Sequence, residues 1–307
     1  MSIALRPFRP GDDQLVVDLW NGSLVRDPIS VSVFRRQTLL NPNFDAAGCL
    51  IAGASDGAAA GFVLAFAPRS QRLHSGAIGA GRIVGLGVLS EYRRHGLGTQ
   101  LLEAALDYLK ERGCVRVSVA AHEYYAAGVD SVAYAEGIGF LTKRGFQQVG
   151  QATAMGRLLY DLEWPEEIRA AERRLATDGI AVIHFESQHT QALAAYFAAE
   201  FPDWIEFFAR KLDARHDLDD MVIAVTKDGE VVGYCQHLDT DHIGPFGVAA
   251  AYRNRGIGSV MLYRLLDRMR EKGFRFAWFG ETGRARPYYE RAGFFVTRTY
   301  TLLKRDL

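Results

Sequence analysis

The stretch LGVLSEYRRHGLGTQLLEAALDYLKERG, residues 86–113, returns as FGVAAAYRNRGIGSVMLYRLLDRMREKG at residues 246–273. A shift of 160 positions (246 − 86) aligns the two without a gap, and the aligned stretches share their glycines, a Tyr-Arg pair and an Asp. Self-similarity of this kind marks a duplicated structural unit. The sequence therefore predicts two tandem copies of one domain.

Each copy predicts a strand, a turn and an amphipathic helix. Apolar residues spaced i, i+3, i+4 and i+7 form one helix face in the first copy from Leu102 and in the second from Leu262. Apolar runs at 115–121 and 274–279 follow the helices, and a strand–helix–strand unit is typical of parallel strands. The fold class is therefore α/β with a mixed sheet in each copy.

Other turns extend the repeat in both directions. Asp-Gly turns at 55–57 and 227–229 predict a hairpin ahead of each unit. Lys143-Arg144-Gly145-Phe146 and Arg291-Ala292-Gly293-Phe294 each predict the end of a helix and the start of a final strand. That second offset is 148 (294 − 146), so the first copy carries 12 extra residues (160 − 148), placed most simply at 122–132 as an acceptor-side or interface loop.

The length supports this organisation, because 307 residues exceed the roughly 150 expected of one domain. The charged segment 165–178 has no wide apolar face and is interpreted as a linker helix. We expect domains at 1–164 and 179–307.

Composition excludes several functional classes. Lys plus Arg (36) equals Asp plus Glu (36), so no overall basic field favours nucleic acid or a membrane surface. No apolar run approaches the ~20 residues of a membrane helix, and no leader pattern is present, so we expect a cytoplasmic protein, monomeric or a homodimer. Three dispersed cysteines suggest neither disulfides nor a metal site.

The turn between strand and helix has the pattern Arg-x-x-Gly-x-Gly in both copies. Glycines let the backbone approach a bulky anion, and the unpaired N–H groups at a helix N-terminus carry partial positive charge. A pyrophosphate is the expected ligand. The stretch Gly85–Ser90 lacks the third glycine of the dinucleotide fingerprint, and no GK[ST] P-loop occurs.

These residues resemble the coenzyme A motif of the GNAT superfamily, V-x(4)-[RQ]-x-x-G-x-[GA], and both copies satisfy it. The resemblance covers almost the whole chain, and the layout is similar to that of tandem acetyltransferases such as mycothiol synthase. It implies acetyl-CoA as co-substrate, no metal, and in each domain a mostly antiparallel twisted sheet around a splayed parallel strand pair flanked by helices. The cofactor-binding residues implied for the second copy are Phe246, Gly247, Val248, Arg253, Asn254, Arg255, Gly256, Ile257, Gly258 and Ser259, with Thr282 where the family often has Asn. Those implied for the first copy are Leu86, Gly87, Val88, Arg93, Arg94, His95, Gly96, Leu97, Gly98 and Thr99.

Acetyl transfer needs a base for the amine and an acid for the departing thiolate. Tyr289 lies four residues before Gly293-Phe294, where the family usually places its acid, and Tyr288 is the lesser candidate. The first copy has Leu141 at that place, which cannot give a proton, so this half is interpreted as binding coenzyme A without turnover. The candidate bases at strand ends are Asp239, Asp241, His242 and Glu281.

The leading hypothesis is an N-acetyltransferase acting on a small-molecule or peptide amine, with chemistry in the C-terminal domain. Two alternatives stay open. One is a non-catalytic acyl-CoA sensor or scaffold. The other is an acetyltransferase acting on a thiol-precursor type of small molecule.

Overall fold

The computed structural model describes residues 4–53, 58–68, 79–120, 126–202, 205, 220–237, 241–280 and 283–307. The chain forms two compact units. The first unit comprises Met1–Ala152 and Arg298–Leu307, and the second unit comprises Thr153–Thr297.

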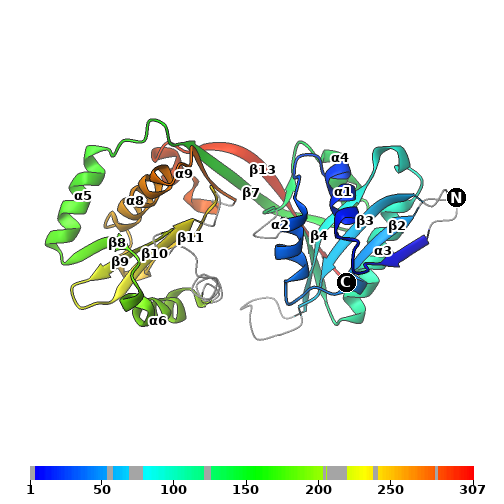
Figure 1. Cartoon of the computed structure of the whole chain (residues 1–307), viewed down its shortest axis with the longest axis horizontal. Helices are drawn as coiled ribbons and strands as arrows, with labels where there is room; N and C mark the ends of the chain where they lie inside the picture. The colour runs from blue at the N-terminus through cyan, green and yellow to red at the C-terminus, as the bar shows by residue number, and fades with distance from the viewer. Residues whose placement is uncertain are drawn as a thin grey trace. The chain divides into compact units, whose positions relative to one another are not determined.

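The first unit is a sheet with helices on both faces (Figure 1). Its strand order is β1-β2-β3-β4-β5-β13, with β6 also paired to β13, and among the described strands the β4–β5 pair alone is parallel. Its helices are α1 (Asp13–Ser23), α2 (Val31–Phe34), α3 (Leu97–Glu111) and α4 (Ala135–Thr142). Its strands are β1 (Ala4–Pro7), β2 (Cys49–Gly53), β3 (Ala59–Phe66), β4 (Ala80–Val88), β5 (Arg116–Val119), β6 (Val129–Asp130) and the start of β7 (Gln147–Leu158).

Alternation along the strands assigns the helices to opposite faces. Phe62 and Leu64 of β3 join α1 and α2 in one apolar cluster, whereas Val63 and Ala65 join α3 and α4 in another. Successive strand residues point to opposite faces, so the nearly continuous apolar sequence of β3 serves both layers. The sheet is therefore buried on both sides.

The described ladder of the parallel pair covers the first part of β4. β4 and β5 pair from Ala80–Arg116 to Ile83–Val119, and the Ala120 N–H donates to the Ile83 carbonyl at 2.8 Å. β4 continues to Val88 alongside β3, and residues 121–125, which follow β5 closely, lie outside the described residues. The expected parallel pair at the centre of the sheet is therefore confirmed in this unit.

The second unit repeats this arrangement. Its main sheet has the order β11-β10-β9-β8, all antiparallel. Its helices are α5 (Glu166–Thr177), α6 (Thr190–Glu200), α8 (Ile257–Glu271) and α9 (Arg286–Arg291). Its strands are β8 (Ile180–His184), β9 (Met221–Thr226), β10 (Val231–His237), β11 (Ile243–Val248), β12 (Phe276–Phe279) and the start of β13 (Phe295–Asp306).

In the second unit the described pairing between the two parallel strands is shorter than in the first unit. Between β11 and β12 the described ladder is one parallel bridge, His242 with Trp278, where the Trp278 N–H donates to the Asp241 carbonyl at 2.9 Å. The corresponding pair in the first unit is Arg82 with Ser118, 160 positions earlier in both strands. All of β11 therefore lies beyond this junction, in the splayed part.

The two copies exchange their final strands. β7 follows the first copy but pairs through Met155–Leu158 with β12, and β13 follows the second copy but pairs through Leu303–Asp306 with β5. Arg157 of β7 donates to the Ala292 carbonyl after α9, and Arg305 of β13 donates to the Arg144 carbonyl after α4, 148 positions apart in both partners. The last strand of each copy thus completes the sheet that the other copy began.

This exchange changes the division expected from the sequence. The units meet in the chain at Ala152/Thr153 rather than within 165–178, and Arg298–Leu307 belongs to the first unit. The segment 165–178 does contain a helix, α5, but Ala171 and Leu175 are buried in the core of the second unit. Part of the predicted insertion forms β6, and residues 121–125 lie outside the described residues.

We expect the exchange to appear in mutational stability. Leu303 is 1% exposed in the first unit's core, and its equivalent Met155 is fully buried in the second unit's core. Truncating a buried Leu or Met to Ala costs about 2–5 kcal/mol. Leu303→Ala should lower amide exchange protection in β2–β5, and the matched Met155→Ala should lower it in β8–β10. The opposite assignment of the two effects would contradict the exchange.

Candidate functional site

Each parallel pair leads into a glycine-capped helix. Gly96 precedes α3 with φ 85° and Gly256 precedes α8 with φ 91°, and two residues earlier Arg94 and Asn254 also adopt positive φ, 66° and 62°. Left-handed backbone favours glycine at the cap. The first N–H groups of a helix have no intrahelical acceptor and favour an anion. Both units thus have a glycine-capped turn, residues 93–99 and 253–259, where the sequence predicts pyrophosphate binding; each turn is called a phosphate cradle below.

A side-chain contact attaches each cradle to its strand. The Arg93 Nε donates to the Val88 carbonyl at 2.9 Å, and the Arg253 Nε donates to the Val248 carbonyl at 3.0 Å. The Ala249 N–H donates to the Val232 carbonyl of β10, and peptide groups alternate in direction along an antiparallel strand. The backbone of Val248 therefore faces away from β10, into the splay.

Neither backbone conformation nor packing requires glycine at positions 98 and 258 of the cradles. Neither has a left-handed φ. A Cβ at Gly98 would meet the Phe140 ring at 3.5 Å, and one at Gly258 would meet the Phe246 ring and the Tyr288 hydroxyl at 3.6 Å, which are ordinary contacts. Glycine at these positions fits close approach of a ligand to the backbone. The cradle residues therefore suit the diphosphate and pantetheine of coenzyme A.

The two cradles differ in their surroundings. A Cβ at Gly96 would have open space, whereas one at Gly256 would lie 3.0 Å from the Ala171 Cβ of α5. In the first unit Arg144 donates to the Thr99 hydroxyl at 2.5 Å, and Ala292 stands at the equivalent place of the second. The first cradle is the more open and the more cationic of the two.

Tyr289 lies between the diverging strands of the second unit. Its ring centroid is 4.2 Å from that of Phe279 on β12 and 6.3 Å from that of Phe246 on β11. The residue is 6% exposed, and burial raises the pKa of its phenol above the ordinary value. It stays protonated at neutral pH and can donate a proton within the splay.

Tyr288 contacts the cradle rather than the junction of the strands. Its hydroxyl is the group that would touch a Cβ at Gly258. Burial also raises the pKa of this phenol, and interaction with the Ser259 side chain of the cradle lowers it in part. The two adjacent tyrosines thus have different neighbours: Tyr289 lies against Phe279 of β12, and Tyr288 lies beside Gly258.

His242 and Asp241 lie where β11 and β12 part. The His242 ring stacks on Trp278 at 4.2 Å, and burial lowers the pKa of the imidazole to about 4. The Asp241 carboxylate accepts the Trp278 Nε1–H at 2.8 Å. At neutral pH His242 is therefore an uncharged imidazole at the junction, while the Asp241 carboxylate holds the tryptophan. Glu281, Thr282 and Asp239 lie outside the described residues.

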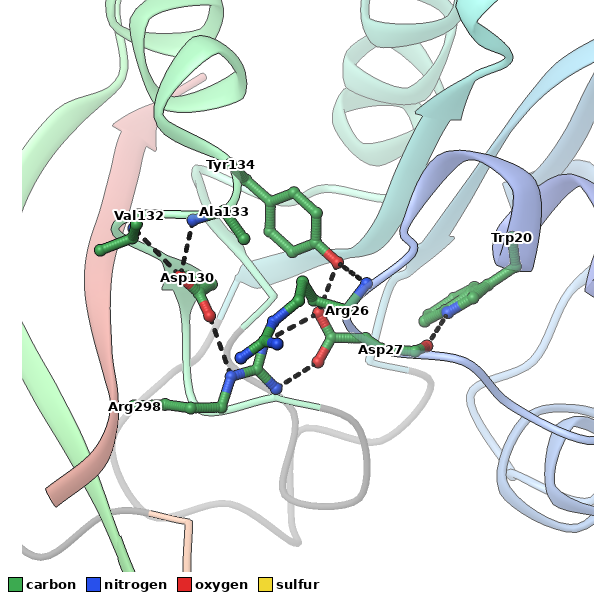
Figure 2. A network of polar contacts seen from close by, with 8 residues as sticks. All are labelled: Trp20, Arg26, Asp27, Asp130, Val132, Ala133, Tyr134 and Arg298. Carbon is green, nitrogen blue, oxygen red and sulfur yellow. Dashed lines mark hydrogen bonds and ion pairs between the residues drawn. The ribbon is translucent and has the colours of Figure 1, made fainter.

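The sequence reasoning missed a polar network in the first unit. Leu141 is buried, as its sequence suggested, but Tyr134 stands seven residues earlier, at the place equivalent to Thr282 (282 − 148). Its hydroxyl donates to Asp27 Oδ2 at 2.8 Å and accepts the Arg26 N–H at 3.0 Å, while Arg298 reaches the same carboxylate at 2.6 Å (Figure 2). The one feature of the sequence that could have indicated this network was the position of Tyr134, seven residues before Leu141.

The described residues contain no cluster of three or more potential metal ligands. Among them, no helix has the length and apolar character needed to cross a membrane.

Comparison with known proteins identifies a shared fold. Residues 18–146 and 182–294 match the model of the acetyltransferase (GNAT) family. A search of curated protein sequences finds no match.

The solved structures that match include three that each cover 99% of this chain. A glucosamine N-acetyltransferase region of a fungal multi-domain GH3 β-N-acetylglucosaminidase is 19% identical with a TM-score of 0.85, and this chain spans 38% of that one. A GCN5-related N-acetyltransferase from Sphaerobacter thermophilus is 22% identical over 95% of its length with a TM-score of 0.71. A tandem GNAT protein from the clavulanic acid biosynthesis pathway is 14% identical over 98% of its length with a TM-score of 0.67. The two-domain fold expected from the repeat is confirmed.

Gly98→Ala and Gly258→Ala should separate ligand approach from folding. Because each new methyl group meets only ordinary contacts, we expect an unchanged or slightly raised melting temperature. Coenzyme A binding at the altered cradle should weaken by ~10-fold or more, because the methyl group occupies the space of the ligand. Calorimetric titration measures this, with Gly53→Ala in β2 as the control. Undiminished binding of coenzyme A in both variants would contradict the assignment of the cradles as its binding sites.

Buried His242 should make the protein less stable in acid. Its pKa is lowered in the fold, so the unfolded chain takes up a proton that the folded chain does not between pH 6.5 and about 4. The stabilisation is complete above pH 6.5 and is lost as the pH falls, by up to about 3 kcal/mol. Denaturant titrations at pH 7 and pH 5 should show a smaller difference in His242→Gln than in the wild type or in the exposed His95→Gln. An equal difference in all three would exclude a buried neutral imidazole.

Proposed function

Because the chain belongs to the acetyltransferase (GNAT) family, we propose that it transfers an acetyl group from acetyl-CoA to an amine, with chemistry in the second unit. The observation that carries this proposal is the position of Tyr289, a protonated phenol whose ring contacts both strands of the splay, β11 and β12. A proton donor between these strands is suited to a thiolate that departs there.

The cradle and the splay bind the donor in this proposal. The N–H groups following Gly256 hold the diphosphate, and the free edge of β11 pairs with pantetheine through the backbone of Phe246 and Val248. Arg253 keeps this strand end and the loop together through the Val248 carbonyl. Acetyl-CoA supplies the acyl group, and no metal takes part.

His242 is the candidate base at the junction of β11 and β12. A general base must be unprotonated when the amine arrives, and His242 is neutral at physiological pH; because its lowered pKa makes it a weak base, it suits an amine that arrives neutral. Asp241 is engaged by Trp278, and its role is to hold the wall of the junction. The amine proton passes to His242, the amine nitrogen bonds to the thioester carbon, and Tyr289 protonates the departing sulfur.

The acceptor is a small-molecule or peptide amine. Glucosamine is the first compound to try, because a structure with this two-domain fold is described as a glucosamine N-acetyltransferase region. A thiol-precursor type of amine is the second. A purely binding role as an acyl-CoA sensor is disfavoured by the buried phenol in the splay, because binding alone does not need a proton donor there.

Tyr289→Phe should test the acid. Loss of a general acid typically lowers turnover by ~10²-fold or more. Donor affinity should stay within about twofold, since the phenyl ring still fills the aromatic cluster. Thiol release from acetyl-CoA with an amine panel gives turnover, and calorimetry gives affinity. Tyr288→Phe is the matched control, and a larger loss there than in Tyr289→Phe would move the acid to Tyr288.

A further inference from the structure

Tyr134 in the first unit reaches from one face of the sheet to the other. Its ring packs with the α3 and α4 cluster, whereas its hydroxyl contacts Arg26 and Asp27, in the loop between α1 and α2 on the opposite face. The described pairing of β4 with β5 ends at Ile83–Val119, and residues 121–125 lie outside the described residues. Tyr134 thus links the helix layers on the two faces of the sheet (Figure 2).

The loop that carries Asp27 is fixed against the motif strand β4. The Trp20 Nε1–H donates to the Asp27 carbonyl at 2.7 Å, and the Trp20 ring lies 2.6 Å from where a Cβ at Gly85 would stand. Asn21 clamps the far end of the loop through both backbone groups of Ile29, at 2.8 and 2.9 Å. Asp27 is thus held near β4, the strand that precedes the first cradle.

The Asp27 carboxylate has a hydrogen-bonding site left for a substrate. Oδ1 accepts from Arg298 Nη1 at 2.6 Å, and Oδ2 accepts from Tyr134 and from Arg298 Nη2 at 3.2 Å. A carboxylate offers about four acceptor sites, so among the described residues one site on Oδ1 is unused. The side chain is 15% exposed, so this site can be reached from outside.

Arg298 is oriented by a second carboxylate. Its Nε donates to Asp130 Oδ2 at 2.9 Å, and Asp130 Oδ1 accepts the N–H groups of Val132 and Ala133 at 3.0 and 2.9 Å. The guanidinium is therefore locked between β6 and the loop. It is a positioning residue that comes from the exchanged strand β13.

We propose that the first unit is a second acetyl-transfer centre for a primary amine, in which Asp27 takes the proton of the acceptor and Tyr134 gives a proton to the departing thiol. This inference rests on the proposed use of acetyl-CoA. It assigns catalysis to the first copy, which the sequence alone indicated to be non-catalytic because Leu141 stands at the position of the acid.

Asp27 and Tyr134, which are hydrogen-bonded to each other, can take up and return every proton of the reaction. A neutral amine nitrogen bonds to the thioester carbonyl carbon, and the carbon–sulfur bond breaks. The proton from nitrogen goes to Asp27, the sulfur takes the proton of Tyr134, and Asp27 then returns its proton to the Tyr134 oxygen. The Arg26 N–H stabilises the phenolate in between. An amide and a thiol are the products.

The second unit does not repeat this arrangement. The place equivalent to Arg298 is Gly150 in β7 (298 − 148), and the place equivalent to Leu141 is Tyr289. The two proposed proton donors thus differ in position: Tyr134 immediately precedes α4, whereas Tyr289 lies within α9. We expect the two centres to accept different amines.

The experiment isolates the first unit by silencing the second. Gly258→Val fills the second cradle, and Tyr289→Phe is a separate background that leaves that cradle intact. In each background Tyr134→Phe, Asp27→Asn and Arg298→Gln are compared by thiol release with a panel of primary amines and by calorimetric titration with acetyl-CoA. Arg116→Gln, which breaks the exposed Arg116–Asp306 pair, is the control.

Support is turnover that persists in both backgrounds and falls ~10²-fold on adding Tyr134→Phe or Asp27→Asn, with donor affinity within about twofold. Arg116→Gln should leave it unchanged. A silenced chain that still binds acetyl-CoA but releases no thiol overturns the proposal and leaves the proposed function standing. The proposal is also overturned if Tyr134→Phe leaves the rate of thiol release unchanged. A wild-type chain that releases no thiol with any amine overturns both.

Discussion

The separation of two parallel strands after a short shared ladder is the constraint on which the rest of the structure depends. In the first unit β4 and β5 pair as far as Ile83 and Val119, and in the second unit β11 and β12 meet at His242 and Trp278. Among the described residues, the edge of β11 that faces away from β10 has no strand partner beyond this bridge, and buried backbone polar groups need partners. In the function proposed above, the amide groups of acetyl-CoA supply these partners, next to the glycine-capped helix at the end of the strand.

The exchange of final strands gives these splays their walls. A strand next to β5 or β12 is needed to cover the second edge of the parallel pair, and that strand comes from the other sequence copy. Arg305 and Arg157 fix the exchanged strands to the turns after α4 and α9. In the first unit the same exchange brings Arg298 to Asp27, so a residue from the end of the chain orders a loop near its beginning.

The two copies differ in the positions of their ionisable side chains. The second unit surrounds its splay with aromatic rings, and burial keeps Tyr289 protonated and His242 neutral. The first unit has aliphatic Leu141 at the acid position and gathers Asp27, Tyr134, Arg298 and Asp130 in one hydrogen-bonded network. A duplicated fold can host different chemistry at each site because the cradle and the acceptor side are built from separate elements.

The sequence by itself determined the duplication, the α/β class, the paired cradles and the position of Tyr289, because these depend on local periodicity and on glycines at fixed spacing. It could not determine the strand exchange, since β7 and β13 have equivalent bounds and either could pair with β5 or β12. Tyr134 and Asp27 are 107 residues apart, and Asp27 and Arg298 are 271 apart. Such contacts arise only when the strands and loops that carry them are packed, so tertiary structure alone decided the network in the first unit and the burial that sets the protonation of His242 and Tyr289.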